Sequence, residues 1–237
     1  MNRNQVKILG YGVDTFSFDD AVEYISEHGG QVVTINPEMI DCARNDKTFS
    51  EIITSAEMVV PDGVGVQLGL KILGYNVRRI AGIDLGMALI KKAATESKKV
   101  AFVGAKPEVI ENAVKNLKLQ LPQLNIVYTH DGYFDDEQSI LNDLVNVSPD
   151  LVFVALGSPK QEFFIHNLKA KLPEAVMIGL GGSFDVWAGA VKRAPKFYQK
   201  TGLEWFYRTV TQPERFKRIF PTLPIFVLRV LKERFIK

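Results

Sequence analysis

The sequence predicts an α/β fold with a mostly parallel sheet and helices on both of its faces. Two observations lead to this prediction. Short runs rich in valine and isoleucine recur between residues 31 and 182, and they are apolar at consecutive positions, as in strands buried on both faces. Segments long enough for a helix separate these runs, and such alternation is typical of parallel sheets.

The elements follow one another regularly along the chain. The predicted strands are QVVTIN (31–36), AEMVVP (56–61), KVAFVG (99–104), NIVYTH (125–130), DLVFVALG (150–157) and AVMIGLGG (175–182). The predicted helices are 37–55, 62–74, 82–97, 106–121, 135–147 and 158–172. Several of these carry apolar residues three or four positions apart, as Phe164, Leu168 and Leu172 do in the last one. We expect residues 1–202 to form this α/β body and residues 203–237 to form a C-terminal appendage.

Composition narrows the classes of function. The chain has 237 residues, of which 46% are hydrophobic and 24% charged, as expected for a globular protein with a sizeable core. Its single cysteine, Cys42, excludes an internal disulfide, and its three scattered histidines lack metal-ligand spacing. We therefore expect neither a metal nor a cofactor. Residues 1–30 contain no basic-then-apolar leader, so we expect the protein to stay inside the cell.

The C-terminal 35 residues differ from the rest in charge. Residues 203–237 carry eight Lys and Arg against three Asp and Glu, a net charge of +5, whereas the remaining residues sum to −3. This segment also holds seven of the aromatic residues. A role in binding nucleic acid is disfavoured, because the body is acidic and the basic residues accompany an apolar stripe.

Three arginines in this segment suggest a phosphate ligand. Arg208, Arg215 and Arg218 have spacings of seven and three, which place them on one helical face. A capping-box pattern over residues 211–214 predicts that a second short helix begins there. We expect the two helices to bring these arginines together on one side, and arginine is suited to bind phosphate through two parallel hydrogen bonds.

The last segment, 219–237, suggests membrane contact. Its apolar run is broken by Pro221 and Pro224 and is too short to span a bilayer. With basic side chains beside the apolar stripe, it suits a helix lying in the membrane interface. These basic residues are Arg229, Lys232, Arg234 and Lys237. The alternative is a C-terminal helix packed on its own body or on another subunit of a homo-oligomer.

Polar residues follow the predicted strands at the edge where open parallel sheets bind their ligands. Thr34 and Asn36 are two positions apart, so their side chains point to the same side of the strand. Asp62 follows the next predicted strand. Asn36 and Asp62 are also preferred helix N-caps. Local sequence thus leaves two interpretations, helix caps or a polar cleft with the Asp62 carboxylate at its centre.

Phosphate-binding motifs are incomplete. GLGGSFDVWAG (179–189) has glycine spacing near a dinucleotide fingerprint but stands late in the chain, so NAD binding is weakly indicated, and no Walker A loop is present. In GSPKQE (157–162), Ser158 and Pro159 suit the start of a helix. The N–H groups there, with Lys160, suit a phosphate equally well. The amide of Gln161 can reach a sugar or base.

An ordered set of segments resembles the WecG/TagA/CpsF group, glycosyltransferase family 26. These segments are TINPEM (34–39), VVPDGVGV (59–66), RIAGIDL (79–85), VGAKPEV (103–109), HDGYF (130–134), VALGSPKQE (154–162), GLGGSFDVWAGAVKRAP (179–195) and GLEWFYRTVTQPERFKR (202–218). They span nearly the whole chain, and the set is more specific than any one member. The resemblance, which is strongest to the teichoic-acid branch, implies a Rossmann-like body with a C-terminal appendage, peripheral on the cytoplasmic membrane face.

The resemblance also implies a reaction. It is the inverting transfer of N-acetylmannosamine from UDP-N-acetylmannosamine to the 4-hydroxyl of the sugar in undecaprenyl-diphosphate-GlcNAc, forming a β-1,4 linkage early in wall teichoic acid synthesis. Matched by position, Asp62 corresponds to the general base. The family's pocket residues correspond to Thr34, Asn36, Arg79 and Gln161, and its appendage arginines, which would meet the diphosphate, to Arg208, Arg215 and Arg218.

The reaction implied by the resemblance is consistent with a carboxylate, Asp62, among the polar residues at the strand ends. An inverting transfer needs a carboxylate to accept the proton of the attacking hydroxyl. In the absence of a clear Asp-x-Asp metal motif, arginines or N–H groups must stabilise the leaving UDP. We expect the site to be complete only when the appendage folds over it. Two alternatives remain at this point. One has another donor, UDP-N-acetylmannosaminuronic acid or a UDP-hexose, for antigen or capsule synthesis, and the other is a non-catalytic peripheral membrane protein that binds sugar nucleotides.

Overall fold

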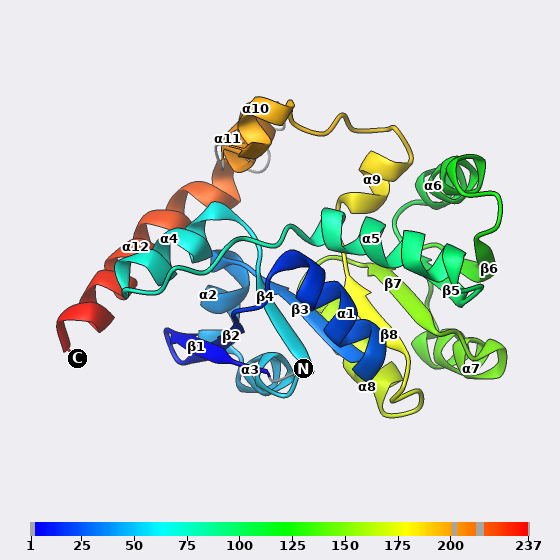
Figure 1. The fold of residues 1–237 in the computed structure, drawn as a ribbon, viewed down its shortest axis with the longest axis horizontal. Coiled ribbons are helices and arrows are strands. Elements are labelled where there is room, and N and C mark those ends of the chain that lie inside the picture. The colour runs from blue at the N-terminus through cyan, green and yellow to red at the C-terminus, as the bar shows by residue number, and fades with distance from the viewer. Residues whose placement is uncertain (1–2, 201–202, 212–215, 237) are drawn as a thin grey trace.

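A parallel sheet of six strands lies at the centre of the computed structural model, which describes residues 3–200, 203–211 and 216–236 (Figure 1). The strands are, in spatial order, β4 (Met58–Pro61), β3 (Gly30–Ile35), β8 (Val176–Gly179), β7 (Leu151–Ala155), β5 (Lys99–Gly104) and β6 (Asn125–His130). Every pairing between neighbours is parallel. The predicted fold class is confirmed, and all the predicted strands are present, with shorter bounds for β4, β7 and β8.

The helices lie where the alternating pattern predicts them, with one exception. They are α2 (Pro37–Asn45), α3 (Lys47–Thr54), α4 (Val64–Ile72), α5 (Gly82–Thr95), α6 (Pro107–Gln120), α7 (Glu137–Val147) and α8 (Lys160–Lys169). The prediction of one helix over 37–55 is wrong, because Asp46 separates α2 from α3. Its carboxylate accepts a hydrogen bond from the Phe49 N–H at 3.0 Å, and its backbone is extended. A capping side chain thus ends one helix and starts the next.

The N-terminal elements have no counterpart among the predicted ones. β1 (Gln5–Ile8) and β2 (Tyr11–Asp14) form an antiparallel hairpin, and α1 (Phe18–His28) follows it. The hairpin turns at Leu9 and Gly10, which both have positive φ, 50° and 92°. Such two-residue turns usually show an Asn-Gly or Asp-Gly signal, and leucine rarely adopts this conformation. The sequence therefore carries no local signal for the hairpin.

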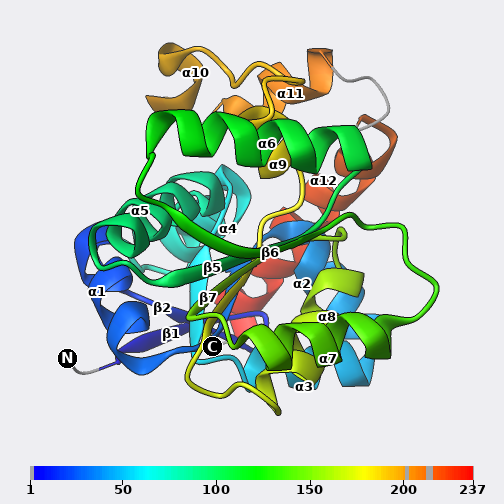
Figure 2. The ribbon, with the colours of Figure 1, turned by 90° about the vertical axis from the view of Figure 1, so that its right-hand side faces the viewer.

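Helices cover both faces of the sheet. One face is covered by α1, α5, α6 and α9 (Ser183–Trp187), and the other by α2, α3, α4, α7 and α8. Consecutive strand residues point into different clusters, as Val32 and Val33 do in β3. Figure 2 shows the two layers, with α6 above the sheet and α7 and α8 below it. Burial on both faces explains why the strands are apolar at consecutive positions.

The chain ends in three helices, α10 (Lys196–Lys200), α11 (Glu204–Thr211) and α12 (Phe216–Ile236). The predicted pair of helices after residue 202 is present as α11 and α12, but the second is not short. It continues for 21 residues, through Pro221 and Pro224. A proline inside a helix costs about 3 kcal/mol, so packing against the body must offset this cost.

The helix α12 packs on the body beside α2 and α4 (Figure 1). The side chains of Phe226 and Val230 are 2% and 0% exposed and belong to the core cluster on that face. Arg229 pairs with Asp41 of α2, and Arg234 donates to the carbonyl oxygen of Ile72. One face of α12 is therefore packed on the protein's own body. This is the arrangement that the sequence offered as an alternative to membrane contact. Two of the basic residues assigned to the membrane interface by sequence instead contact this body.

Candidate functional site

A cavity of about 640 Å³ opens at the carboxyl ends of β3, β4 and β8. Residues of the loops after these strands line it, together with the starts of α5 and α8 and residues of α11 and α12. The predicted site residues in its lining are Thr34, Asn36, Asp62, Arg79 and Gln161. This is the edge at which open parallel sheets bind ligands. Arg215 lies outside the described residues, as do the side chains of Arg208 and Arg218.

Parallel pairing of β3 with β4 brings the residues predicted at the ends of these two strands, Asn36 and Asp62, close together. Ile35 lies opposite Pro61, and the Asp62 N–H donates to the Ile35 carbonyl at 2.9 Å. The Asn36 Oδ1 accepts a hydrogen bond from the Met39 N–H at 3.0 Å and caps α2. The cap interpretation of Asn36 is thus confirmed. Because the cap uses only the amide oxygen, the amide NH₂ group stays available to a ligand in the cavity.

Asp62 is not the N-cap residue of α4. Gly63 occupies the N-cap position with φ of 80°, and α4 has no side-chain cap bond. Glycine adopts this positive φ readily, which suits it to the position between Asp62 and the first residue of α4. The Asp62 carboxylate lies instead 3.6 Å from Arg79 Nε, and its side chain is 32% exposed. Asp62 is therefore not the N-cap residue of α4, and its carboxylate faces the cavity lined by predicted site residues.

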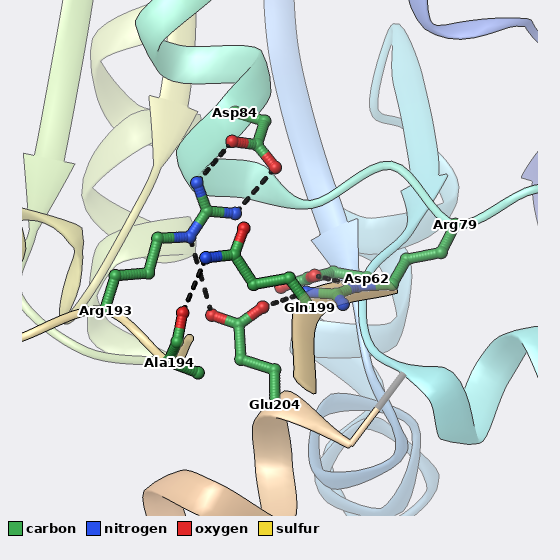
Figure 3. Close-up of polar contacts among 7 residues, drawn as sticks. All are labelled: Asp62, Arg79, Asp84, Arg193, Ala194, Gln199 and Glu204. Atoms are coloured by element: carbon green, nitrogen blue, oxygen red, sulfur yellow. Dashed lines mark hydrogen bonds and ion pairs between the residues drawn. The ribbon is translucent and has the colours of Figure 1, made fainter. Parts of the chain in front are cut away.

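Arg79 lies between two carboxylates (Figure 3). Its Nε faces Asp62, and its Nη2 donates a hydrogen bond of 2.9 Å to Oε2 of Glu204, the first residue of α11. The Glu204 side chain is only 6% exposed. A buried carboxylate is costly unless it is paired, so Glu204 and Arg79 stabilise each other. The C-terminal segment thus contributes an acidic side chain to the cavity.

Arg193 extends this network (Figure 3). Its two terminal nitrogens donate hydrogen bonds of 2.6 and 2.7 Å to the Asp84 carboxylate, and its Nε lies 3.8 Å from Glu204 Oε1. The bond with Asp84 raises the pKa of Arg193, against the opposite effect of burial. Within the described residues, neither Arg79 Nε nor Arg193 Nε has a hydrogen-bond partner; both make ion pairs at longer distance.

Sequence reasoning did not identify Asp84, Arg193 or Glu204 as site residues. All three fall within segments that carry the family resemblance, in RIAGIDL, GLGGSFDVWAGAVKRAP and GLEWFYRTVTQPERFKR. Glu204 stands among the basic residues of the C-terminal segment, where a buried acidic residue is unexpected. Their pairing joins residues more than a hundred positions apart, which local patterns do not predict.

Gln161 connects α8 to the glycine-rich loop after β8. Its Nε2 donates to the Glu162 Oε1 at 2.8 Å, and its Oε1 accepts from the Gly181 N–H at 3.2 Å. A Cβ at Gly179 would lie 2.5 Å from Gln161 Nε2, so any larger residue there would displace the Gln161 side chain. Close packing against Gln161 thus explains this glycine without a dinucleotide. The second N–H of the Gln161 amide stays available to a ligand.

Glu162, next to Gln161, is a buried carboxylate. Burial raises its pKa to about 7, although hydrogen bonds from Gln161 and Ser158 act in the opposite direction. Ser158 therefore interacts with Glu162 and does not cap α8, which has no side-chain cap bond. Lys160 lies over the ring of Phe134, at 5.0 Å from its centroid, and is not part of the cavity lining. The structure thus gives Lys160 no place in a phosphate site here.

The remaining candidate groups in the cavity are less suited to chemistry. Burial, followed by the charges of Asp46, Asp41 and Glu162, raises the pKa of Cys42, so its thiol remains protonated and is a weak nucleophile. Among residues 3–200, 203–211 and 216–236, no group of three or more His, Cys, Asp or Glu is arranged to hold a metal ion. What the cavity does offer is the partly exposed Asp62 carboxylate with the Arg79 guanidinium beside it, further carboxylates at Glu38 and Asp41, and several hydrogen-bonding groups.

Comparison with known proteins identifies close relatives. Residues 6–237 match the model of the Glycosyl transferase WecG/TagA/CpsF family. A Bacillus spizizenii protein named N-acetylglucosaminyldiphosphoundecaprenol N-acetyl-beta-D-mannosaminyltransferase is 39% identical over 231 residues, which cover 97% of this chain and 90% of the relative. A Bacillus subtilis protein of the same name is 40% identical over 221 residues, 92% of this chain and 86% of the relative.

Proposed function

We propose a function from the premise that the chain belongs to the WecG/TagA/CpsF family of glycosyl transferases: the protein transfers N-acetylmannosamine to undecaprenyl-diphosphate-GlcNAc. The observation that carries this proposal is the identity of 39% and 40%, over nearly the whole chain, to two enzymes named for that reaction. The donor in this proposal is UDP-N-acetylmannosamine, and the product enters wall teichoic acid synthesis. No observation favours a uronate donor, another hexose donor or a non-catalytic role.

Asp62 is the general base in this proposal. The acceptor hydroxyl attacks the anomeric carbon, a new C–O bond forms, and the bond from that carbon to the UDP oxygen breaks with its electron pair leaving on UDP. The Asp62 carboxylate accepts the hydroxyl proton. Support comes from its place at the cavity and its 32% exposed side chain, which leave it accessible to an acceptor.

The donor occupies the cavity between the strand ends. A volume of about 640 Å³ lies within the range of small-molecule sites. Thr34, Asn36 and Gln161 line it, and the unused N–H groups of the two amides are suited to the hydroxyl and acetamido groups of a sugar or to the uracil ring. We assign these three residues to substrate binding.

The diphosphate of UDP needs more positive charge than the α/β body supplies. In the described part of the site, Arg79 and Arg193 already pair with three carboxylates, Asp62, Asp84 and Glu204. We therefore assign the diphosphate to Arg208, Arg215 and Arg218, together with Arg79. The observation that supports this assignment is that α11, which contains Arg208, begins at the cavity with Glu204. Charge-assisted bonds to arginine stabilise the leaving UDP.

The outer face of α12 contacts the cytoplasmic membrane surface in this proposal. Ile225, Leu228 and Phe235 are exposed and lie along one side of the helix with Lys232, opposite the buried Phe226. An apolar stripe with adjacent basic residues favours the interface of an anionic bilayer. Among the described residues, no helix combines the length and apolarity needed to cross a membrane.

A product assay tests the proposed function. The protein is incubated with undecaprenyl-diphosphate-GlcNAc in detergent and, separately, with UDP-N-acetylmannosamine, UDP-N-acetylmannosaminuronic acid, UDP-GlcNAc and UDP-glucose. Mass analysis of the lipid should show one added N-acetylhexosamine with UDP-N-acetylmannosamine. Transfer of another sugar in preference would replace the proposed donor, and no transfer from any donor would contradict the enzymatic function.

A further inference from the structure

Glu162 is a buried carboxylate that the fold disfavours in its ionised form. It is 4% exposed, and burial raises its pKa to about 7, so the folded protein favours the protonated form. Its Oε2 atom is buried and has no hydrogen-bond partner among the described residues. An apolar side chain of similar length would remove both unfavourable effects. Stability therefore does not explain why a carboxylate occupies this position on α8.

Glu162 lies behind two groups of the cavity. Its Oε1 accepts a hydrogen bond of 2.8 Å from Gln161 Nε2, and its carboxylate also accepts one from the Ser158 hydroxyl. Gln161 and Ser158 line the cavity, whereas Glu162 is not among the described residues of its lining. Glu162 can therefore act on a ligand through these two side chains.

The Gln161 amide is held in one orientation by two partners of opposite kind. The Gly181 N–H donates to its Oε1 at 3.2 Å, and Glu162 accepts from its Nε2 at 2.8 Å. A half-turn of the amide would set an N–H against an N–H and an oxygen against a carboxylate oxygen. Gln161 therefore offers an N–H to the cavity, and Glu162 supplies the shorter of the two bonds that fix this orientation.

The Ser158 hydroxyl is held in the opposite sense. A hydroxyl has one hydrogen to donate and two lone pairs, and an ionised carboxylate only accepts. Ser158 therefore donates its hydrogen to Glu162 and offers its oxygen, as an acceptor, to the cavity. Because Gln161 and Ser158 bond to the same carboxylate, this acceptor and the Gln161 N–H lie near each other.

We propose that Glu162 is a positioning residue that presents Gln161 as a donor and Ser158 as an acceptor to one polar group of the sugar nucleotide. A suitable group both accepts and donates a hydrogen bond, as a sugar hydroxyl or the imide of uracil does. Without Glu162, the amide and the hydroxyl rotate more freely, and ordering them on binding lowers the affinity. This inference rests on the proposed function, which assigns Gln161 to substrate binding.

Calorimetric titration of the full chain with UDP and with UDP-N-acetylmannosamine, at about pH 8 where Glu162 is ionised, tests this role. Glu162→Met keeps the length of the side chain but removes the acceptor, so its Kd for UDP-N-acetylmannosamine should rise by roughly tenfold. Glu162→Gln keeps an acceptor oxygen and should stay within about threefold of the wild type. An equal rise in the Kd for UDP places the recognised group on UDP, and an unchanged Kd for UDP alone places it on the sugar. Unchanged Kd for both ligands would overturn the inference.

Asp14 provides a control for loss of stability. It is 0% exposed, its carboxylate accepts a hydrogen bond of 2.7 Å from the Val59 N–H, and it is not among the described residues that line the cavity. Asp14→Asn should lower the midpoint of urea unfolding without changing the Kd for either ligand. Glu162→Met should do the reverse, keeping or raising the midpoint at this pH while it weakens binding. Loss of affinity in proportion to loss of stability in the two variants would contradict a positioning role.

A variant that lacks both partners tests whether Glu162 acts through them. In a chain that combines Ser158→Ala with Gln161→Leu, Glu162→Met should cause less than about twofold further loss of affinity. A further loss as large as in the wild-type background would overturn the inference. If Glu162→Met does not fold, Glu162→Leu is measured by the same criteria. A wild type that binds neither ligand contradicts the proposed function itself, whereas wild-type binding with an unchanged Kd in Glu162→Met contradicts only the role of Glu162.

Discussion

Glu204 accepts a hydrogen bond from Arg79 at 2.9 Å across 125 positions of the chain. The contact joins the first residue of α11 to the loop between α4 and α5, and Arg79 in turn faces Asp62 at 3.6 Å. The C-terminal segment therefore contributes directly to the cavity at the carboxyl edge of the sheet. Its helix α12 also supplies two residues to the core.

Replacement of Asp62 should separate catalysis from stability. Asp62→Asn removes the proton acceptor, so we expect kcat to fall by about 10²- to 10⁴-fold while the Kd for UDP changes little. Since Asp62 is not the N-cap residue of α4 and asparagine has nearly the same size, the midpoint of urea unfolding should change little. Turnover assays, calorimetric titration with UDP and urea unfolding provide the measurements.

Asp46 provides the control for Asp62, because its side chain does cap a helix. Asp46→Ala should lower the free energy of unfolding by about 1 kcal/mol and leave kcat unchanged. A full loss of stability in Asp62→Asn with normal turnover per folded molecule would contradict the assignment of Asp62 as the base.

Phe226 should be required for stability of the whole body. Phe226→Ala removes a side chain that is 2% exposed within the core cluster of α2 and α4. We expect the free energy of unfolding to fall by about 3–5 kcal/mol, measured by urea unfolding. For the same reason, deletion of residues 203–237 would remove part of the core along with the appendage, so single replacements test the appendage more cleanly.

The exposed face of α12 should determine binding to membranes. Leu228 and Phe235 are 66% and 82% exposed, so replacing both with serine should change the free energy of unfolding by less than about 0.5 kcal/mol. Binding to vesicles that contain phosphatidylglycerol should weaken by tenfold or more, on the order of the loss of two apolar anchors. Cosedimentation measures this binding, and unchanged binding would show that another surface contacts the bilayer.

Glu162 should make stability depend on pH. Its pKa is raised from 4.5 to about 7 in the folded protein, so the folded state retains a proton that the unfolded state releases. Its contribution to stability is therefore complete below about pH 4.5 and is lost as pH rises to about 7, by an amount of the order of 3 kcal/mol. Urea unfolding between pH 4.5 and 8 measures this loss.

Glu162→Gln provides the comparison for that measurement. The amide keeps an acceptor for Gln161 but does not titrate. The difference in unfolding free energy between wild type and Glu162→Gln should change with pH in favour of the variant as pH rises. A constant difference across this range would contradict the raised pKa of Glu162.

The α/β body is largely predictable from sequence, because its signals are local. Strands buried on both faces must be apolar at consecutive positions, and helices between them must show apolar spacing of three and four. The elements that departed from prediction depend on single backbone positions. Leu9 adopts a positive φ without a turn signal, and Asp46 interrupts a helical pattern with its own cap.

The candidate site, like the fold, is predictable from sequence only in part. Local sequence patterns are enough to place Thr34, Asn36 and Asp62 at the ends of neighbouring strands, since parallel strands present their carboxyl ends at one edge. By contrast, the N-cap position of Gly63 and the place of Arg79 between Asp62 and Glu204 are seen only in the folded protein. The physical reason is distance along the chain: hydrophobic periodicity and capping act within a few residues, whereas a buried ion pair between residues 79 and 204 exists only after the chain has folded.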